Sequence, residues 1–253
     1  MARVLFLPGF MQNGVRLART AQELEAGLKN LGVTIDYVDP PIKIASRDQV
    51  YYPLGANAIE ADKKWKSVVE RDFNRCWWDY RGRDAYLGFD ESLNWIINYI
   101  KENGPYDGIM GFSQGSSMAA ILTNSINRLL PQHGNFKFSI FISGLAFTEP
   151  IDKSKPDVNQ AEDINEYIAN VKLKSKFATY FTRPENLDTK VVVIYGTSDP
   201  VLPPLRTQYL ASIYQPHVTI IEFVGGHYVP KDKQVVDKIV KAIKPVVQSK
   251  SNL

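Results

Sequence analysis

The five residues GFSQG, from Gly111 to Gly115, have the types and spacing of a nucleophilic serine held in a sharp turn. The apolar run DGIM precedes them and the helix-forming SSMAAILTNSINRLL follows, so the turn joins a strand to a helix. Glycine on each side would relieve crowding, and the N-terminus of the helix would favour developing negative charge on Ser113. On this motif alone an alternative stays open, in which Ser113 and Gln114 only cap an ordinary helix, because serine is a preferred cap.

A nucleophilic serine needs a base, and the chain has three histidines. His133 lies beyond the helix that follows Ser113, and His217 lies just before an apolar run, so both are expected at the opposite edge of the sheet. His227 follows the run VTIIEF in VGGHYVP, at the carboxyl end of a strand, where Ser113 also emerges. His227 is therefore the predicted base, and the alternative is a surface-loop histidine held by a diglycine turn.

The acid that orients the base should follow another strand, between the serine and the histidine in chain order. The stretch VVVIYGTSDPVLP places Asp199 four residues after Tyr195, where a strand gives way to a turn. Ser113, Asp199 and His227 then occur in the order Ser, Asp, His. A competing interpretation is that Asp199 only caps a helix that starts near Pro203.

Attack on a carbonyl also requires hydrogen-bond donors for the oxyanion. One is expected from the backbone N–H of the residue after the nucleophile, Gln114, and the other from a loop after an early strand. FLPGFMQNG is such a loop, and Gly9 would let the N–H of Phe10 approach a substrate. The alternative is that Pro8-Gly9 is a plain turn.

Apolar runs rich in Val, Ile and Phe alternate with segments of helical period along the chain. The runs cover residues 3–7, 34–38, 107–112, 138–143, 191–196 and 218–223. This alternation predicts an α/β fold with a mostly parallel central sheet covered by helices on both faces. A last helix with apolar residues from Val235 to Ile243 is expected to break at Pro245.

Two segments depart from the strand and helix alternation, at about 40–88 and about 147–189. We expect a single domain spanning 1–253 in which these two excursions could form a cap over the sheet, because long irregular segments in α/β proteins tend to be lids or binding loops. Four aromatic residues of the first excursion could line an apolar acyl pocket, or could simply be core packing: Trp65, Trp77, Trp78 and Tyr80.

The composition excludes several classes of function. The 30 Lys and Arg against 27 Asp and Glu give a formal net charge of +3 without a dense basic cluster, so nucleic acid is not an expected partner. Pro8 and Gly9 interrupt the first apolar run far short of a membrane span. The single cysteine, Cys76, cannot form an internal disulfide, which favours a cytoplasmic location, and the C-terminal SNL resembles a peroxisomal tail only weakly.

With these residues in view, the chain resembles the fungal family of serine hydrolases (the FSH group) of the α/β-hydrolase fold, to which a human ovarian-cancer-associated hydrolase is related. The similarity extends over nearly the whole chain, through VLFLPGFMQNG, NGPYDGIMGFSQGSSMAAILTN, ISGLAFTEP, IYGTSDPVLP and GGHYVPKDK. The resemblance assigns the nucleophile, acid and base to Ser113, Asp199 and His227. In one respect the chain departs from the family, because Pro8 stands where the family usually has histidine.

These observations predict a serine hydrolase that cleaves carboxylic esters or thioesters through an acyl-enzyme on Ser113. The expected substrate is a small molecule with a short to medium acyl chain, and no organic cofactor or metal is expected, since three scattered histidines and one cysteine supply no zinc ligand set. Two alternatives are a ligand-binding receptor built on the same frame without catalysis, and an acyl transferase. The sequence does not determine the oligomeric state.

Overall fold

The central feature of the computed structural model, which describes residues 1–80, 86–152, 154 and 160–249, is a six-stranded parallel sheet. Its strand order is β10-β9-β6-β5-β1-β2, and every neighbouring pair is parallel. The strands are β1 (Ala2–Leu7), β2 (Val33–Tyr37), β5 (Gly108–Phe112), β6 (Phe138–Ile142), β9 (Lys190–Gly196) and β10 (Val218–Phe223). The predicted α/β class is confirmed, with each strand within a residue of the apolar run that predicted it.

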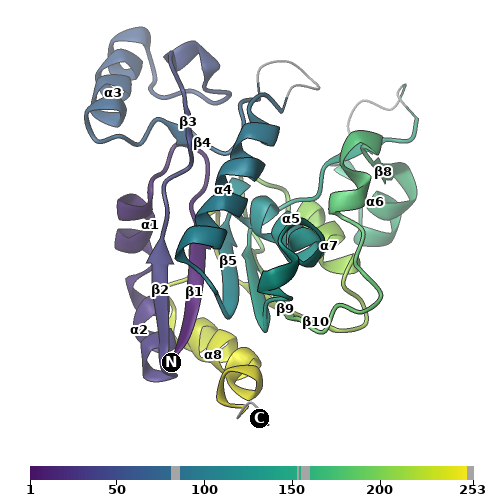
Figure 1. The fold of residues 1–253 in the computed structure, drawn as a ribbon. Coiled ribbons are helices and arrows are strands. Elements are labelled where there is room, and N and C mark those ends of the chain that lie inside the picture. Colours follow the sequence, from purple (N-terminus) through teal and green to yellow (C-terminus); the bar gives the residue numbers. More distant parts are fainter. Residues whose placement is uncertain (81–85, 153, 155–159, 250–253) are drawn as a thin grey trace.

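Helices cover both faces of this sheet (Figure 1). One face carries α1 (Gly14–Thr20), α2 (Gln22–Asn30) and α8 (Lys233–Gln248), and the other carries α4 (Phe89–Asn103), α5 (Gln114–Leu129) and α7 (Pro204–Ser212). Alternate residues of β1 enter two separate cores, because successive side chains of a strand point to opposite faces. Val4 and Phe6 pack with the first set of helices, whereas Leu5 and Leu7 pack with the second.

The expected break of the last helix at Pro245 is wrong, because α8 continues through Pro245 to Gln248. Proline removes one N–H donor and so leaves the carbonyl of Lys241 without its helical partner. Both Pro245 and Lys241 are exposed, and this carbonyl can be hydrated. The helix also ends three residues after Pro245, at Gln248, so few helical hydrogen bonds lie beyond the proline.

Both excursions lie beyond the carboxyl ends of the strands (Figure 1), and they meet where Tyr86 of the first stacks on Phe147 of the second, with ring centroids 4.2 Å apart. The first contains β3 (Ile42–Lys43), the 3-10 turn η1 (Arg47–Gln49), α3 (Ala58–Glu70) and β4 (Arg75–Cys76); the second contains β7 (Thr148–Pro150), α6 (Ile164–Asn170), β8 (Val171–Leu173) and η4 (Ser175–Tyr180). Each is built on a short antiparallel pair, β3 with β4 and β7 with β8. Residues 81–85, 153 and 155–159 of the excursions, and the tail SNL, lie outside the described residues.

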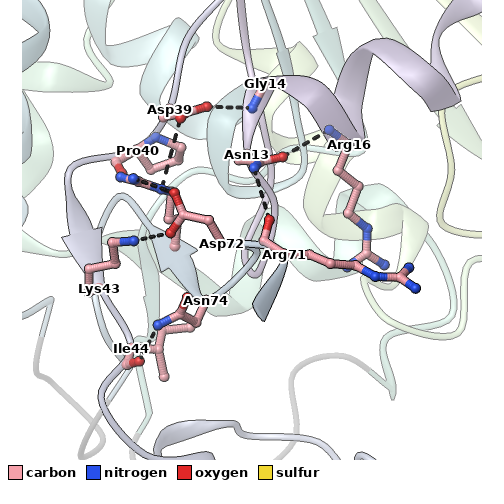
Figure 2. A network of polar contacts seen from close by, with 11 residues as sticks. Asn13, Gly14, Arg16, Asp39, Pro40, Lys43, Ile44, Arg71, Asp72 and Asn74 are labelled. Carbon is pink, nitrogen blue, oxygen red and sulfur yellow. Dashed lines mark hydrogen bonds and ion pairs between the residues drawn. The ribbon is translucent and has the colours of Figure 1, made fainter. Parts of the chain in front are cut away.

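Polar contacts fasten the first excursion to the loop after β1 (Figure 2). The side-chain oxygen of Asn13 accepts a hydrogen bond from the Arg16 N–H at 2.9 Å and caps α1, while its amide nitrogen donates to the Arg71 carbonyl at 3.4 Å. The buried Asn74 side chain donates to the Ile44 carbonyl at 2.9 Å. The bond from Asn13 therefore joins the excursion to the loop that contains Phe10, and the bond from Asn74 ties together two segments of the excursion itself.

Candidate active site

The candidate site lies at the point in the sheet where the order of the strands reverses. From β1 the chain proceeds to β2 on one side, whereas β5, β6, β9 and β10 follow one another on the other side. In open parallel sheets, ligands bind outside the carboxyl ends of the strands at such a reversal. Ser113 leaves β5 and Phe10 follows the adjacent β1, so both emerge at this point.

Ser113 is held in a strained turn between β5 and α5. Its φ of 54° lies in the left-handed region, which non-glycine residues seldom adopt. Ser113 does occupy the N-cap position of α5, but its side chain accepts no capping hydrogen bond from the described residues. Its Oγ instead lies 2.9 Å from Nε2 of His227. The geometry therefore disagrees with the interpretation of Ser113 as an ordinary helix cap.

Glycine is required at both flanking positions by the closeness of backbone atoms. A Cβ added to Gly115 would lie 2.2 Å from the carbonyl oxygen of Leu7 and 2.4 Å from that of Pro8, and one added to Gly111 would lie 2.2 Å from the carbonyl oxygen of Gly115. The first turn of α5 thus packs directly on the end of β1, which sets the position of Ser113 relative to the Phe10 loop.

Gly115→Ala is expected to lower the free energy of unfolding by about 3 kcal/mol, because overpacking against rigid backbone forces a shift. Esterase activity should fall with it, since the turn that carries Ser113 must move. Urea unfolding and kcat on an ester would measure both effects. Gly32→Ala is the control: it has open space around its Cβ but a φ of 82°, so we expect a cost of about 1 kcal/mol and normal activity. Equal effects of the two substitutions would contradict the packing argument.

A continuous chain of hydrogen bonds links Ser113 to Asp199 through His227. The Nδ1 atom of His227 lies 2.6 Å from Oδ2 of Asp199, while its Nε2 faces Ser113. The other carboxylate oxygen of Asp199 accepts hydrogen bonds from the N–H groups of Val201 and Leu202 at 2.9 and 2.8 Å. Asp199 therefore both fixes the turn before α7 and contacts the imidazole, so its two proposed uses are not exclusive.

The surroundings of Asp199 favour its charged form. Burial acts to raise the pKa of its carboxyl group, but the hydrogen bonds from His227 and from the Leu202 and Val201 N–H groups outweigh it, and the pKa lies below its usual value. The Asp199 side chain is 1% exposed and that of His227 is 13% exposed. The imidazole thus has a buried carboxylate behind it and an accessible edge toward Ser113.

The lowered pKa of Asp199 predicts a specific pH dependence of stability. The unfolded chain binds this proton more readily than the fold does, so the contribution of Asp199 is complete above its unfolded pKa of about 4 and is lost as the pH falls through the folded pKa. The difference in free energy of unfolding between the wild type and Asp199→Asn should therefore shrink from about pH 6 to about pH 3. Urea titrations at several pH values test this, and a difference that widens in acid would contradict it.

The loops after β9 and β10 are joined, which brings Asp199 and His227 together. The N–H of Thr197 donates to the Phe223 carbonyl and that of Ser198 to the Gly225 carbonyl, both at 2.9 Å. A Cβ on Gly225 would lie 2.1 Å from the hydroxyl of Tyr228. A larger residue than glycine at position 225 would therefore require the Tyr228 side chain to move.

The other two histidines lie at the opposite edge of the sheet, as predicted. His133 accepts a hydrogen bond from the N–H of Tyr106 at 3.1 Å, just before β5 begins, and His217 immediately precedes β10. Neither is near the carboxyl ends of the strands. His227 is the histidine that the fold brings to Ser113.

The two predicted oxyanion donors lie on either side of Ser113. In the loop after β1, the N–H of Gly9 donates to the Gln12 side chain and that of Met11 donates to the Arg75 carbonyl. The N–H groups of Phe10 and Gln114, by contrast, make no hydrogen bond to any residue that the structure describes. Both are therefore available to a substrate oxygen, and their role stays a prediction.

Comparison with known proteins identifies the family. The family model for serine hydrolase (FSH1) matches residues 1–239. The chain belongs to this serine hydrolase family. It is 26% identical to Family of serine hydrolases 3 of Saccharomyces cerevisiae over 75% of each chain, and 24% identical to Family of serine hydrolases 2 of the same yeast over 94% of this chain and 96% of the relative.

Solved structures agree on the fold of this FSH1-family member. Acyl-protein thioesterase 2 of Zea mays superposes with a TM-score of 0.52 over 97% of this chain and 93% of the other, at 17% identity. The predicted α/β-hydrolase fold is confirmed, and the family makes the chain an ester-hydrolysing enzyme. Two further relatives are longer proteins, of which the chain matches only 26% and 27% of the length.

In this hydrolase the residue after the serine also anchors the first excursion. The side-chain amide of Gln114 accepts a hydrogen bond from the Trp77 N–H and donates to the Trp78 carbonyl, both at 2.8 Å. The indole N–H of Trp77 donates to the carbonyl of Pro8 at 2.9 Å. The loop that contains Pro8 is thus held from the excursion side.

The aromatic residues of the first excursion divide between core and site. Trp77 and Trp78 are fully buried in the core, and Trp65 packs in a smaller cluster with Ile44 and Cys76, so these three are packing residues. Tyr80 does line a cavity beside Ser113. Of the two interpretations, core packing therefore holds for the three tryptophans, and Tyr80 is the one of the four that lines the cavity.

Two cavities open onto Ser113 and His227. The first, of about 310 Å³, is lined also by Tyr51, Tyr80, Tyr86, Gln114, Leu145, Val201, Leu202 and Arg206. The second, of about 520 Å³, is lined also by Phe10, Met11, Gln12, Arg16, Tyr51, Tyr52, Phe112, Pro200 and Val201. Ser113 and His227 thus border both cavities, which also share Tyr51 and Val201.

Sequence reasoning did not identify most of these lining residues. Val201 and Leu202 lie two and three residues after Asp199, and that closeness in sequence was a usable signal. Tyr51 and Tyr86 come from an irregular segment without periodicity, so nothing in the sequence indicated which way they point. Arg206 lies in the first turn of α7, and its position toward the serine depends on how that helix packs.

Other chemistry finds little support among the residues that the structure describes. Within them, no group of three or more His, Cys, Asp or Glu side chains is arranged to hold a metal ion. Burial raises the pKa of the Cys76 thiol to about 12, so this cysteine stays protonated in the core. No described helix has both the length and the apolar character needed to cross a bilayer.

Proposed function

We propose that the enzyme cleaves carboxylic esters or thioesters of small molecules through an acyl-enzyme on Ser113, with His227 as the base and Asp199 as the acid that orients it. The observation that carries this proposal is the unbroken chain of hydrogen bonds at 2.9 and 2.6 Å from Ser113 through His227 to Asp199, at the mouth of two cavities. A buried carboxylate, an imidazole and an accessible hydroxyl in this order are what nucleophilic acyl transfer requires.

In the first half of the reaction, Nε2 of His227 takes the proton of the Ser113 hydroxyl as Oγ attacks the carbonyl carbon. Asp199 holds the imidazole in the tautomer with the proton on Nδ1 and stabilises the imidazolium that forms. The tetrahedral intermediate then collapses, the bond to the leaving alcohol or thiol breaks, and His227 returns the proton to it. Water repeats the sequence on the acyl-enzyme and releases the acid.

The negative charge of the tetrahedral intermediate would be stabilised by the N–H groups of Phe10 and Gln114. Both are backbone donors on segments fixed by neighbouring contacts, so they need little rearrangement during the reaction. The N–H of Gln114 also lies at the N-terminus of α5, where the helix dipole favours negative charge. Because both donors are backbone groups of other residues, proline instead of histidine at position 8 does not remove either of them.

The cavities favour a short to medium acyl chain. The first cavity, of about 310 Å³, is near the lower end of the usual range for ligand pockets, about 300 to 1,000 Å³. Its tyrosine and leucine side chains suit an apolar chain. A single domain over residues 1–253 and a cytoplasmic location stay predictions from the sequence.

Labelling with a fluorophosphonate tests the proposal, since such probes react with activated serines. We expect one probe molecule per chain on Ser113 in the wild type, and none in Ser113→Ala. A burst of product on an activated ester, followed by a slower steady state, would show the acyl-enzyme. Labelling that persists in Ser113→Ala would refute the assignment. Transfer to an added alcohol in preference to water would instead indicate an acyl transferase.

A further inference from the structure

The smaller cavity beside Ser113 contains a cation that its protein surroundings do not neutralise. Arg206, in α7, lines this cavity together with tyrosine and leucine side chains, and no Asp or Glu is among the described lining residues. The hydroxyl of Thr207, the next residue, donates to the Gly144 carbonyl at 2.7 Å, which fixes the first turn of α7 against the loop after β6. Arg206 is therefore on a rigid element next to the nucleophile.

The guanidinium of Arg206 has no protein partner among the described residues. No described carboxylate lies within ion-pair distance, and no described oxygen accepts a hydrogen bond from the guanidinium; the backbone N–H of Arg206 donates to the Pro203 carbonyl at 3.0 Å. The residue is nevertheless only partly exposed. A partly buried charge without a partner costs free energy, and an anionic ligand would remove that cost.

The charge of Arg206 acts on the wall of the cavity. Burial raises the pKa of both Tyr51 and Tyr80, and the positive charge of Arg206 opposes that rise in each case. The rings of Tyr51 and Tyr80 and the guanidinium of Arg206 therefore line the same cavity. An anion placed there would find an arginine and tyrosine hydroxyl groups that remain protonated and able to donate.

Arg16 in the second cavity differs in this respect. Its guanidinium donates to the Met11 carbonyl at 3.1 Å and lies 5.1 Å from the centre of the Phe73 ring. One of its N–H groups thus holds the loop after β1, and its flat face lies on Phe73 of the first excursion. Of the two arginines that reach the cavities at Ser113, Arg206 is the one left for a substrate.

From this difference we infer that the substrate is an ester that bears a carboxylate, and that Arg206 binds this carboxylate in the smaller cavity while Ser113 attacks the ester carbonyl. The inference rests on the proposed function of Ser113. Arginine suits the role because its planar fork can donate two parallel hydrogen bonds to a carboxylate. The small volume of the cavity makes the linking chain short, as in the half-esters of short dicarboxylic acids.

Two pairs of small esters provide the test. Monoethyl glutarate has a carboxylate on the acyl part, and ethyl 5-methylhexanoate has the same chain with an isopropyl group in its place. A second pair carries the carboxylate or the isopropyl group on the alcohol part of an acetate ester. Hydrolysis is followed by chromatography of the released acid, and each pair yields a ratio of kcat/KM, carboxylate over neutral.

In at least one pair we expect a wild-type ratio above one, which Arg206→Met lowers by roughly 10- to 100-fold, as loss of a hydrogen-bonded charge pair implies. Arg206→Lys should restore part of the ratio. Arg19→Met removes the same charge from the exposed end of α1 and should leave the ratio as in the wild type. A ratio that is unchanged in Arg206→Met, or that falls in Arg16→Met instead, would overturn the inference.

Failure of this inference can be told apart from failure of the proposed function. If Ser113 is labelled by the fluorophosphonate and the neutral esters are hydrolysed, but carboxylate esters are not preferred, Ser113 retains its role and Arg206 loses its own. If Ser113→Ala hydrolyses all four esters as fast as the wild type, the proposed function fails and the inference falls with it.

Discussion

Replacing Ser113 or His227 with alanine is expected to lower kcat for a carboxylic ester by at least about 10³-fold, with a much smaller change in KM. The hydroxyl is the attacking group and the imidazole is its base, so neither loss can be compensated by the other residue. Both substitutions remove partly exposed atoms at the mouth of a cavity, and the fold should persist. Steady-state kinetics and urea unfolding on the same preparations separate activity from stability.

Matched controls exist for each of these substitutions. Ser212→Ala removes a hydroxyl that donates to the Tyr209 carbonyl in α7, and His217→Ala removes a histidine from the opposite edge of the sheet. Both should retain kcat within about threefold, as surface substitutions away from a site usually do. If His227→Ala were as active as His217→Ala, another group would have to be the base.

Asp199→Asn is expected to lower kcat by about 10²- to 10⁴-fold. The asparagine amide can donate to Nδ1 of His227, and the imidazole proton would then lie on Nε2. A protonated Nε2 cannot accept the proton of Ser113. The two hydrogen bonds from Val201 and Leu202 can still reach the remaining oxygen, so the turn should keep its shape. Asp199→Asn should therefore remain folded near neutral pH, although less stable than the wild type, and its loss of kcat should reflect a slower reaction.

Asp237→Asn is the control for Asp199→Asn, because Asp237 is an exposed aspartate that pairs with Lys233 on α8. We expect wild-type kcat for it. A fluorophosphonate reacts by the same base-assisted attack, so its rate of labelling should fall in Asp199→Asn and stay normal in Asp237→Asn. Wild-type labelling in Asp199→Asn would remove Asp199 from the proposed mechanism.

Much of the architecture was predictable because parallel strands covered on both faces are nearly all apolar. RVLFL in β1 and VVVIYG in β9 are such runs, and their strands begin and end within a residue of them. The placement of His227 and Asp199 followed from the same regularity, since residues just after such strands gather at one edge. The structure brings these residues to Ser113, and their catalytic roles are for kinetics to test.

The excursions were not predictable in the same way. β3 and β4 contain two residues each, too few for a pattern to be visible, and their pairing depends on contacts distant in sequence. Trp77 and Trp78 could have been pocket or core, and the decision lies in hydrogen bonds to Gln114 and Pro8 that no local pattern encodes. The predicted helix break at Pro245 was wrong because proline breaks helices mainly at central or buried positions, and Pro245 is exposed and close to the end of α8.

The hydrogen bonds of the Gln114 side chain limit how substrates can reach the nucleophile. If the chain at Trp77 and Trp78 moved outward to admit a ligand, the side-chain amide of Gln114 would lose both hydrogen bonds. The backbone N–H of the same residue is the proposed donor to the oxyanion. Opening at this point would therefore break the contacts that hold Gln114 in place next to Ser113. Entry and exit are then expected past Tyr51 and Val201, each 53% exposed, so larger side chains at those two positions should slow bulky esters more than small ones.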